Sequence, residues 1–144
     1  MFPGVDSLRR FPALALLLLV AACATPRPPS PQPAAQPFFA EEGTASWYGP
    51  GHQGKRTASG ERFDPRAFTA AHRTLPFDTV LRVTNLGNGR TVRVRVNDRG
   101  PYAKGRVLDL SAAAGAALGF TAEGVARVRI EAFAADQAGA LTKR

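Results

Sequence analysis

The stretch "VLRVTNLGNGRTVRVRVND", residues 80–98, decides the fold. Its two ends, 80–85 and 91–98, alternate apolar and polar side chains, which is the period-two pattern of a half-buried β-strand. Between them lies Asn88-Gly89, a dipeptide typical of the type I′ turn because both central positions of that turn need a positive φ. The stretch therefore predicts a β-hairpin. Three side chains of its second strand share the apolar face: Val92, Val94 and Val96.

Further short stretches with strand character occur on both sides of this hairpin, at residues 43–48, 106–111 and 126–133. Short strands in such number, with little helix, predict an all-β domain rather than a doubly wound parallel sheet. Closing the sheet on itself would also leave no exposed strand edge. We therefore expect a small closed β-barrel over residues 43–134.

One helix is predicted over residues 111–119, with Ser111 as its N-cap and Gly119 as the residue that ends it. Gly115 inside this helix lowers its stability by about 1 kcal/mol relative to alanine. We expect close packing of this small residue against the sheet as compensation. Residues 135–144 show no stable period, which predicts a flexible tail.

The N-terminal residues 1–22 predict a secretory signal peptide. Arg9 and Arg10 precede an apolar run of 12 residues, from Phe11 to Ala22, whereas a membrane-spanning helix needs roughly 20. The chain's single cysteine, Cys23, follows this run at the place where a bacterial lipoprotein signal has its acylated residue. The pattern predicts lipidation of Cys23 and attachment to a membrane. The alternative is an ordinary signal peptide that ends near a cysteine by coincidence.

Residues 23–42 are predicted to be a linker behind the lipidated cysteine. The part from 24 to 40 holds six prolines and no apolar face, so it should form a semi-extended spacer. The chain carries a formal net charge of +8, which outside the cytoplasm favours an acidic polymer or an anionic surface as its partner. No nucleic-acid-binding motif is present in the sequence, so a nucleic-acid partner is not expected.

Asp98 ends the second strand of the hairpin, in the motif "NDRGPY". If the alternation continues to this residue, Asp98 lies on the valine face at the rim of the core, and Arg99 points away from it. A partly desolvated carboxyl group has a raised pKa and can act as a general acid. Alternatively, Asp98 caps the turn that follows it, which is a common role of aspartate. The spacing alone does not decide between these two roles.

Two polar segments supply further candidates, Glu61 in "KRTASGERF" and His72 in "TAAHRTLPF". The alternative interpretation of Glu61 is a solvated acid in a loop. The alternative interpretation of His72 is a structural residue held by hydrogen bonds. The spacing of His52 and His72 is not that of a zinc site, so neither a metal nor an organic cofactor is expected. Trp47-Tyr48 closes the first strand, and alternation directs one ring into the core and the other outward, where it can stack on a sugar.

The motifs "GTASWYG" (43–49), "TASGERFD" (57–64), "TAAHRTLPFDT" (69–79) and "GRVLDLS" (105–111), together with residues 83–102, resemble the rare lipoprotein A family. The resemblance covers residues 43 to about 133. It implies a six-stranded double-psi β-barrel with one or two short helices, related to the barrels of expansins. It also implies a lytic transglycosylase, which cleaves peptidoglycan between N-acetylmuramic acid and N-acetylglucosamine without water and leaves 1,6-anhydro ends.

By this resemblance the catalytic residues are Glu61, His72 and Asp98. We hypothesise that Asp98 is the acid and then the base, that His72 orients Asp98 or binds sugar, and that Glu61 holds hydroxyl or amide groups of the substrate. The candidate substrate-binding residues come from the same motifs: Trp47, Tyr48, Ser59, Arg99 and Asp109. The resemblance also implies peptidoglycan as the partner, with envelope or division proteins as further partners. Ala24 follows the cysteine instead of an aspartate that would favour inner-membrane retention, so an outer-membrane lipoprotein facing the periplasm is expected. The alternative is a noncatalytic, expansin-like module that binds glycan or loosens the wall. An envelope scaffold that binds other proteins is a third hypothesis.

Overall fold

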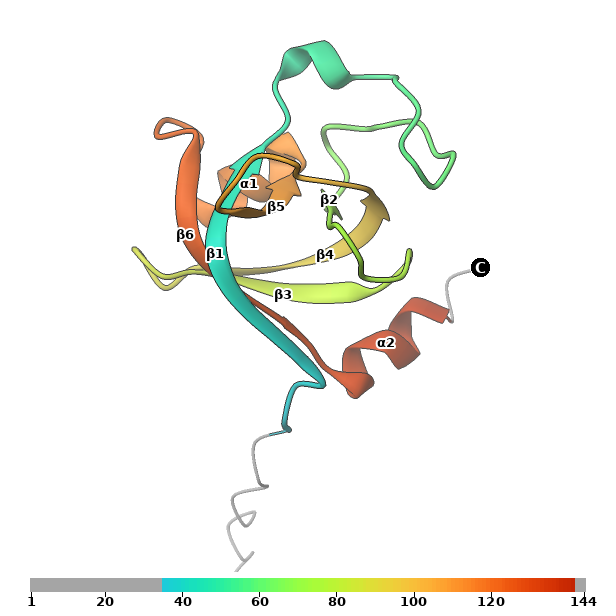
Figure 1. Cartoon of the computed structure of the whole chain (residues 1–144), viewed down its shortest axis with the longest axis vertical. Helices are drawn as coiled ribbons and strands as arrows, with labels where there is room; N and C mark the ends of the chain where they lie inside the picture. The colour runs from blue at the N-terminus through green and yellow to red at the C-terminus, as the bar shows by residue number, and fades with distance from the viewer. Residues whose placement is uncertain (1–34, 142–144) are drawn as a thin grey trace, which may run out of the picture. The chain divides into compact units, whose positions relative to one another are not determined.

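The computed structural model describes residues 35–141, which form a six-stranded barrel with two short helices (Figure 1). A single 3₁₀ turn, Pro50–His52, follows the first strand. The elements in chain order are β1 (Phe39–Trp47), β2 (Thr69–Ala71), β3 (Val80–Asn85), β4 (Thr91–Asp98), β5 (Arg106–Leu110), α1 (Ala112–Leu118), β6 (Val125–Ala132) and α2 (Ala134–Leu141). Within this part of the chain, no helix is long and apolar enough to cross a bilayer.

The barrel closes in the strand order β1-β5-β2-β4-β3-β6, with β6 pairing back onto β1. Two pairs, β1 with β5 and β2 with β4, are parallel, and the other four are antiparallel. Every strand therefore has a neighbour on both sides, which removes the exposed edges that a small open sheet would have. The expected all-β barrel with six strands and one or two short helices is confirmed.

The β3–β4 hairpin has the predicted strands but not the predicted turn. Gly89 has a φ of 75°, whereas Asp78 is the only non-glycine residue with a positive φ between residues 35 and 141. The N–H of Gly89 donates to the carbonyl of Asn85 (2.8 Å), and the N–H of Asn85 donates to the carbonyl of Arg90 (2.8 Å), so the loop is longer than a two-residue turn. Asn88 is instead bound through its side chain to the carbonyl of Leu118. The type I′ expectation was wrong, because Asn88 does not have the positive φ that this turn requires.

Helix α1 has both of its predicted ends. The Ser111 hydroxyl accepts the N–H of Ala114, and Gly119 takes the left-handed conformation that ends the helix. A Cβ atom placed on Gly115 would lie 3.1 Å from the Cβ of Trp47. The expected close packing of this glycine against the sheet is confirmed, and the contact is with β1.

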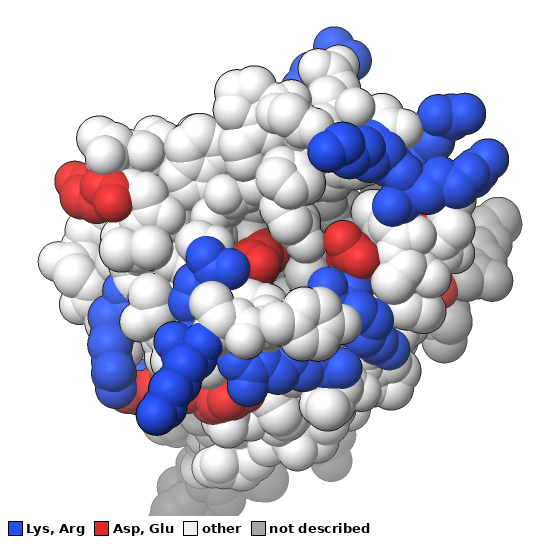
Figure 2. Space-filling model, turned by 45° about the horizontal axis from the view of Figure 1, so that its top comes forward, with Lys and Arg blue, Asp and Glu red and all other residues white. Residues whose placement is uncertain are grey.

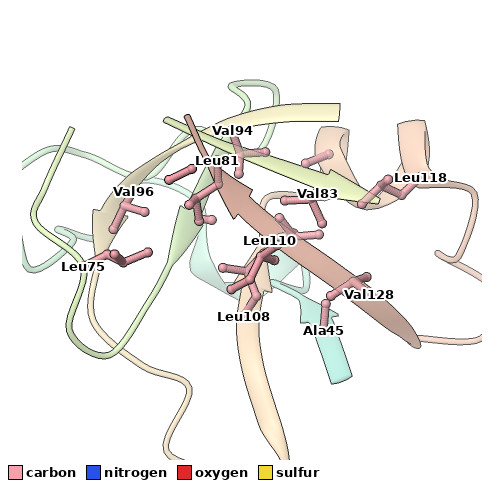
Figure 3. Close-up of a cluster of buried hydrophobic side chains, with 14 of the residues drawn as sticks. Ala45, Leu75, Leu81, Val83, Val94, Val96, Leu108, Leu110, Leu118 and Val128 are labelled. Carbon is pink, nitrogen blue, oxygen red and sulfur yellow. The ribbon is translucent and has the colours of Figure 1, made fainter. Parts of the chain in front are cut away.

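The core fills the inside of the barrel with aliphatic side chains from all six strands and from α1 (Figure 3). Val94 and Val96 are buried, whereas Arg93 and Arg95 of the same strand lie outside the core, so alternation holds through most of β4. The largest fully buried side chains include Phe120, which follows α1. This core fixes the strands whose outer faces carry the polar residues discussed below.

One strand boundary and two further elements differ from those expected. Strand β1 begins at Phe39, four residues before the expected start at 43, because its first residues pair with the end of β6. Strand β2 has only three residues and was not predicted as a strand, since two of them are alanine. Helix α2 replaces the expected tail: the Gln137 side chain binds both the N–H and the carbonyl of Val80. This tertiary contact stabilises a segment that has no amphipathic pattern of its own.

Candidate functional site

A pocket of about 110 Å³ lies beside the end of β4, under the segment that connects the 3₁₀ turn to β2. In a view turned toward this side of the barrel, acidic side chains lie in a hollow of the surface with lysine and arginine side chains around it (Figure 2). The pocket is lined by Tyr48, His52, Lys55, Arg56, Thr57, Phe63 and Asp98. Of the residues predicted from the sequence, it therefore contains Tyr48 and Asp98.

The Asp98 carboxylate accepts three hydrogen bonds. Its Oδ1 atom accepts the backbone N–H groups of Ala58 (2.9 Å) and Arg99 (2.8 Å), and its Oδ2 atom accepts the hydroxyl of Tyr48 (3.1 Å). The bond to Arg99 is the turn contact that the sequence allowed, and the bond to Tyr48 places the same carboxylate at the pocket. Three donors directed at one carboxylate fix its position at the pocket.

The expected position of Asp98 on the valine face was wrong, because β4 contains an irregularity one residue earlier. In the register with β2, Ala70 pairs with Val96 but Ala71 pairs with Asp98, so Asn97 is an extra residue. Such a bulge shifts the alternation by one residue, and Asp98 shares the face of Ala71 rather than the core face of Val96. Arg99 does point away from Asp98, as expected: its guanidinium binds the carbonyl of Leu75 (2.8 Å).

Asp109 of β5 lies on the same outer face as Asp98 of β4, two strands along the sheet, with β2 between them. It pairs with Ala71 of β2 and with Ser46 of β1, so a row of residues on this face crosses four neighbouring strands. The Ser46 hydroxyl donates to Asp109 Oδ1, and the Nε atom of Arg106, which is buried without a hydrogen-bond partner, lies 3.6 Å from the same oxygen. The register therefore places the carboxyl groups of Asp98 and Asp109 on one face.

Tyr48 interacts with both of these carboxyl groups, with Asp98 through a hydrogen bond and with Asp109 through its charge. Burial of its hydroxyl raises the pKa of Tyr48 far above the ordinary value for tyrosine, and the negative charges of Asp98 and Asp109 raise it further. The Tyr48 side chain therefore remains a neutral hydrogen-bond donor to Asp98 at physiological pH. Its ring contacts those of His52 and Phe63, with centroid distances of 4.9 and 5.1 Å.

Trp47 and Tyr48 lie on opposite sides of the sheet, as alternation predicted. Trp47 packs against the core and Gly115, so it is a structural residue of β1 in this arrangement. Ser59 is bound through its N–H to the carbonyl of Asn97 (3.2 Å), which attaches its segment to β4. The structure thus brings Tyr48 to the pocket and not Trp47.

Glu61 does not line the pocket but forms an ion pair on the outer face of β4. Its two oxygens accept the two terminal nitrogens of Arg95 at 2.7 and 2.8 Å, and the Asn97 side chain donates to Oε2 (3.2 Å). This bidentate geometry is the strong form of an arginine–carboxylate contact. Glu61 is therefore an ion-pair partner of Arg95 beside the pocket, and not one of the residues that line it.

His72 is buried, and its imidazole nitrogens contact groups other than the Asp98 carboxylate. The N–H groups of Thr74 and Leu75 donate to its Nδ1 atom at 3.2 and 3.1 Å, and Nε2 lies 3.5 Å from Oε2 of Glu41. Two donors on Nδ1 require the neutral tautomer with its proton on Nε2. Only the backbone of His72 reaches Asp98, through its N–H to the Asp98 carbonyl (3.2 Å).

The buried state of His72 predicts a pH-dependent stability. Desolvation lowers the pKa of His72 below its ordinary value, with Arg99 and Arg73 acting in the same direction and Glu41 acting against them. The unfolded chain therefore binds a proton near pH 6.5 that the folded chain binds only at lower pH, so acidification favours unfolding. We expect the free energy of unfolding, measured by urea denaturation, to fall as the pH is lowered from 7 to 5.

The same measurement on His72→Asn identifies the group responsible. The asparagine Oδ1 atom retains an acceptor for the N–H groups of Thr74 and Leu75 but does not titrate in this range. The pH dependence in the variant should be weaker, by at most about 1.4 kcal/mol per pH unit for one proton. Equal slopes in the two proteins would show that His72 is not the titrating group.

Five pocket residues were not predicted as site residues: His52, Lys55, Arg56, Thr57 and Phe63. Most of them lie in the segment 55–63, from which the sequence indicated only Ser59 and Glu61 as site residues. His52 was considered only for a zinc site, and among the described residues no group of three His, Cys, Asp or Glu side chains could hold a metal ion. The position of this segment over the end of β4 depends on contacts between distant residues, which no local pattern encodes.

Curated proteins with similar sequences match this chain over about 90 residues. A protein of Synechocystis sp., "Probable endolytic peptidoglycan transglycosylase RlpA", is 61% identical over 89 residues, which are 62% of this chain and 28% of that protein. The "Endolytic peptidoglycan transglycosylase RlpA" of Neisseria meningitidis serogroup A is 54% identical over 93 residues, which are 65% of this chain and 39% of that protein. The chain thus spans less than half the length of these curated relatives.

Solved structures with the same fold include an inhibitor and an expansin. The Streptomyces papain inhibitor matches with a TM-score of 0.54 and 26% identity, over 66% of this chain and 94% of the inhibitor. The expansin of Clavibacter michiganensis matches with a TM-score of 0.50 and 29% identity, over 64% of this chain and 49% of the expansin. A family model described as "Lytic transglycolase" matches residues 40–130, which are more than half of the chain. The chain therefore belongs to the lytic transglycolase family, as its motifs indicated.

Proposed function

We propose that this barrel is a peptidoglycan lytic transglycosylase that cleaves the bond between N-acetylmuramic acid and N-acetylglucosamine. The observation that supports it most directly is the Asp98 carboxylate at a pocket, hydrogen-bonded to a tyrosine that stays protonated. Relatives named as peptidoglycan transglycosylases, at 54% and 61% identity over the barrel, support the substrate and the type of reaction.

In the proposed reaction, Asp98 starts as the protonated acid. Its Oδ1 atom accepts two backbone N–H groups, so the proton is carried by Oδ2, the oxygen beside Tyr48. This proton passes to the glycosidic oxygen as the bond from that oxygen to C1 of the muramic sugar breaks. The three donors bind the resulting carboxylate more strongly than the acid, so they favour the transition state over the ground state.

The second step needs no water. The 6-hydroxyl oxygen of the muramic sugar forms a bond to C1, and its proton passes to the Asp98 carboxylate. The acid is regenerated, the leaving sugar carries the first proton, and the product has a 1,6-anhydro ring. A single carboxyl group therefore acts as acid and then as base, unlike the two carboxyl groups of a glycoside hydrolase.

The location of the enzyme is part of the same proposal. Residues 1–22 act as a lipoprotein signal peptide, Cys23 is lipidated, and the proline-rich segment behind it links the barrel to the outer membrane, on the side of the periplasm. These features rest on the sequence, since residues 1–34 lie outside the described part of the chain. A wall-directed enzyme in the cell envelope is consistent with the peptidoglycan named in its relatives.

Digestion of purified peptidoglycan tests the proposed reaction. The full chain should release soluble fragments with 1,6-anhydro ends, which are one water lighter than hydrolysis products and are identified by mass spectrometry. Fragments with ordinary reducing ends would instead indicate a hydrolase. Intact polymer that retains the protein would indicate the noncatalytic alternative, a glycan-binding module.

A further inference from the structure

Arg95 of β4 contacts two other segments of the chain, one through Glu61 and one through Asp78. Its side chain lies on the outer face of the strand and donates to both oxygens of Glu61, and its Nη1 atom also donates to Oδ1 of Asp78 (3.1 Å). Asp78 lies just before β3, has a φ of 69°, and donates its N–H to the carbonyl of Val96 (2.8 Å). The guanidinium is therefore held between two carboxylates.

Glu61, the partner of Arg95, belongs to a tight turn that also contacts Asp98. The N–H of Thr57 donates to the carbonyl of Glu61 (2.8 Å), and the N–H of Gly60 donates to the carbonyl of Thr57 (2.9 Å). At the tip of this turn, the N–H of Ala58 donates to Oδ1 of Asp98 (2.9 Å). One turn thus presents a carboxylate to Arg95 and an amide to Asp98.

We infer that Arg95 is a positioning residue for Asp98, which it reaches through Glu61. Its ion pair with Glu61 holds the turn 57–61 against β4. The position of this turn maintains the hydrogen bond from the Ala58 N–H to Asp98 Oδ1. This inference rests on the proposed function of Asp98. It also gives Glu61 a supporting role, because both oxygens of its carboxylate accept hydrogen bonds from one guanidinium and Glu61 does not line the pocket.

The geometry favours anchoring over an incidental surface contact. An isolated exposed ion pair contributes little, but this one is bidentate and is joined by Asn97 and Asp78. The Ser59 N–H adds a backbone bond from the turn to the carbonyl of Asn97 (3.2 Å). Because a shift of about 1 Å in a catalytic group can reduce a rate about 10²-fold, a turn released from β4 would affect the reaction strongly.

Kinetics of Arg95→Gln in the full chain test the inference. The turnover number for anhydro-product formation should fall on the order of 10²-fold, with a smaller change in KM, because the acid loses a positioning hydrogen bond while most of the pocket lining lies outside the turn. Arg95→Lys keeps the charge but not the bidentate fork, so its turnover number should lie between those of Arg95→Gln and the native chain. Arg129→Gln is the matched control, since Arg129 forms an ion pair of similar exposure with Glu42 on β1. It should retain the native turnover number.

The amide resonance of Ala58 gives a readout that does not depend on activity. In Arg95→Gln, the Ala58 N–H should move upfield and exchange faster with solvent, because its hydrogen bond to Asp98 is lost, and in Arg129→Gln it should not change. A native turnover number in Arg95→Gln, or an unchanged Ala58 resonance, would overturn the inference. Absence of anhydro products from the native chain would instead contradict the proposed function, while the Ala58 resonance would still report whether Arg95 holds the turn.

Discussion

Replacement of Asp98 by asparagine is expected to reduce the rate of anhydro-product formation by about 10²- to 10⁴-fold, the usual contribution of a positioned acid or base. The amide can neither give a proton to the glycosidic oxygen nor take one from the 6-hydroxyl. Its Oδ1 atom can still accept the N–H groups of Ala58 and Arg99, so the turn and the end of β4 should be retained. The measurement is the initial rate of release of anhydro fragments from peptidoglycan, quantified by mass spectrometry.

A matched control separates the loss of this carboxylate from a general effect of charge. Asp64→Asn makes the same chemical change at an exposed residue that accepts the N–H of Arg66 and does not line the pocket. Its rate should equal that of the native chain. A native rate in Asp98→Asn would exclude Asp98 as the acid, and equal losses in the two variants would point to a general effect of charge.

Local patterns predicted the elements that local interactions stabilise. The strands at 80–85 and 91–98 have their predicted bounds because alternation and a short connection specify a hairpin without help from the rest of the chain. Helix α1 was predicted for the same reason, since its N-cap and its terminal glycine act within the helix. Strand β2 and helix α2 were missed because contacts with distant strands stabilise them, in α2 through Gln137 and Val80.

The candidate site was predictable to the extent that its residues lie in motifs. Asp98 and Tyr48 do meet at the pocket, but the bulge at Asn97 reverses the face on which Asp98 was expected. A bulge depends on the register between β2 and β4, which are parallel strands separated by a whole hairpin strand, so no local signal marks it. The His72 side chain, which directly follows β2, bonds to the N–H groups of Thr74 and Leu75 and lies near Glu41, which are contacts that its motif did not indicate.

The packing between α1 and the barrel is expected to depend strongly on one aromatic ring. Phe120 is 2% exposed and belongs to the core cluster, and its N–H donates to the carbonyl of Gly115, so it joins the end of α1 to the interior of the barrel. Truncation of a buried phenylalanine to alanine usually costs about 3–5 kcal/mol, from lost burial and from the cavity that remains. The total stability of a domain of this size is about 5–15 kcal/mol, so this loss would remove a large part of it.

Urea denaturation of Phe120→Ala measures this loss, and the fluorescence of the chain's single tryptophan, Trp47, reports it at β1, where its ring packs against α1. Phe38→Ala is the matched control, because the Phe38 side chain is 61% exposed and lies before β1. The control should change the free energy of unfolding by less than about 0.5 kcal/mol, the usual effect of a surface substitution. Equal losses in the two variants would contradict the assignment of Phe120 to the core. A loss confined to Phe120→Ala would support the assignment of Phe120 to the core that joins α1 to the barrel. The outer face of β4, which carries Asp98, is held only as firmly as this core behind it, so the geometry of the pocket depends on the same packing.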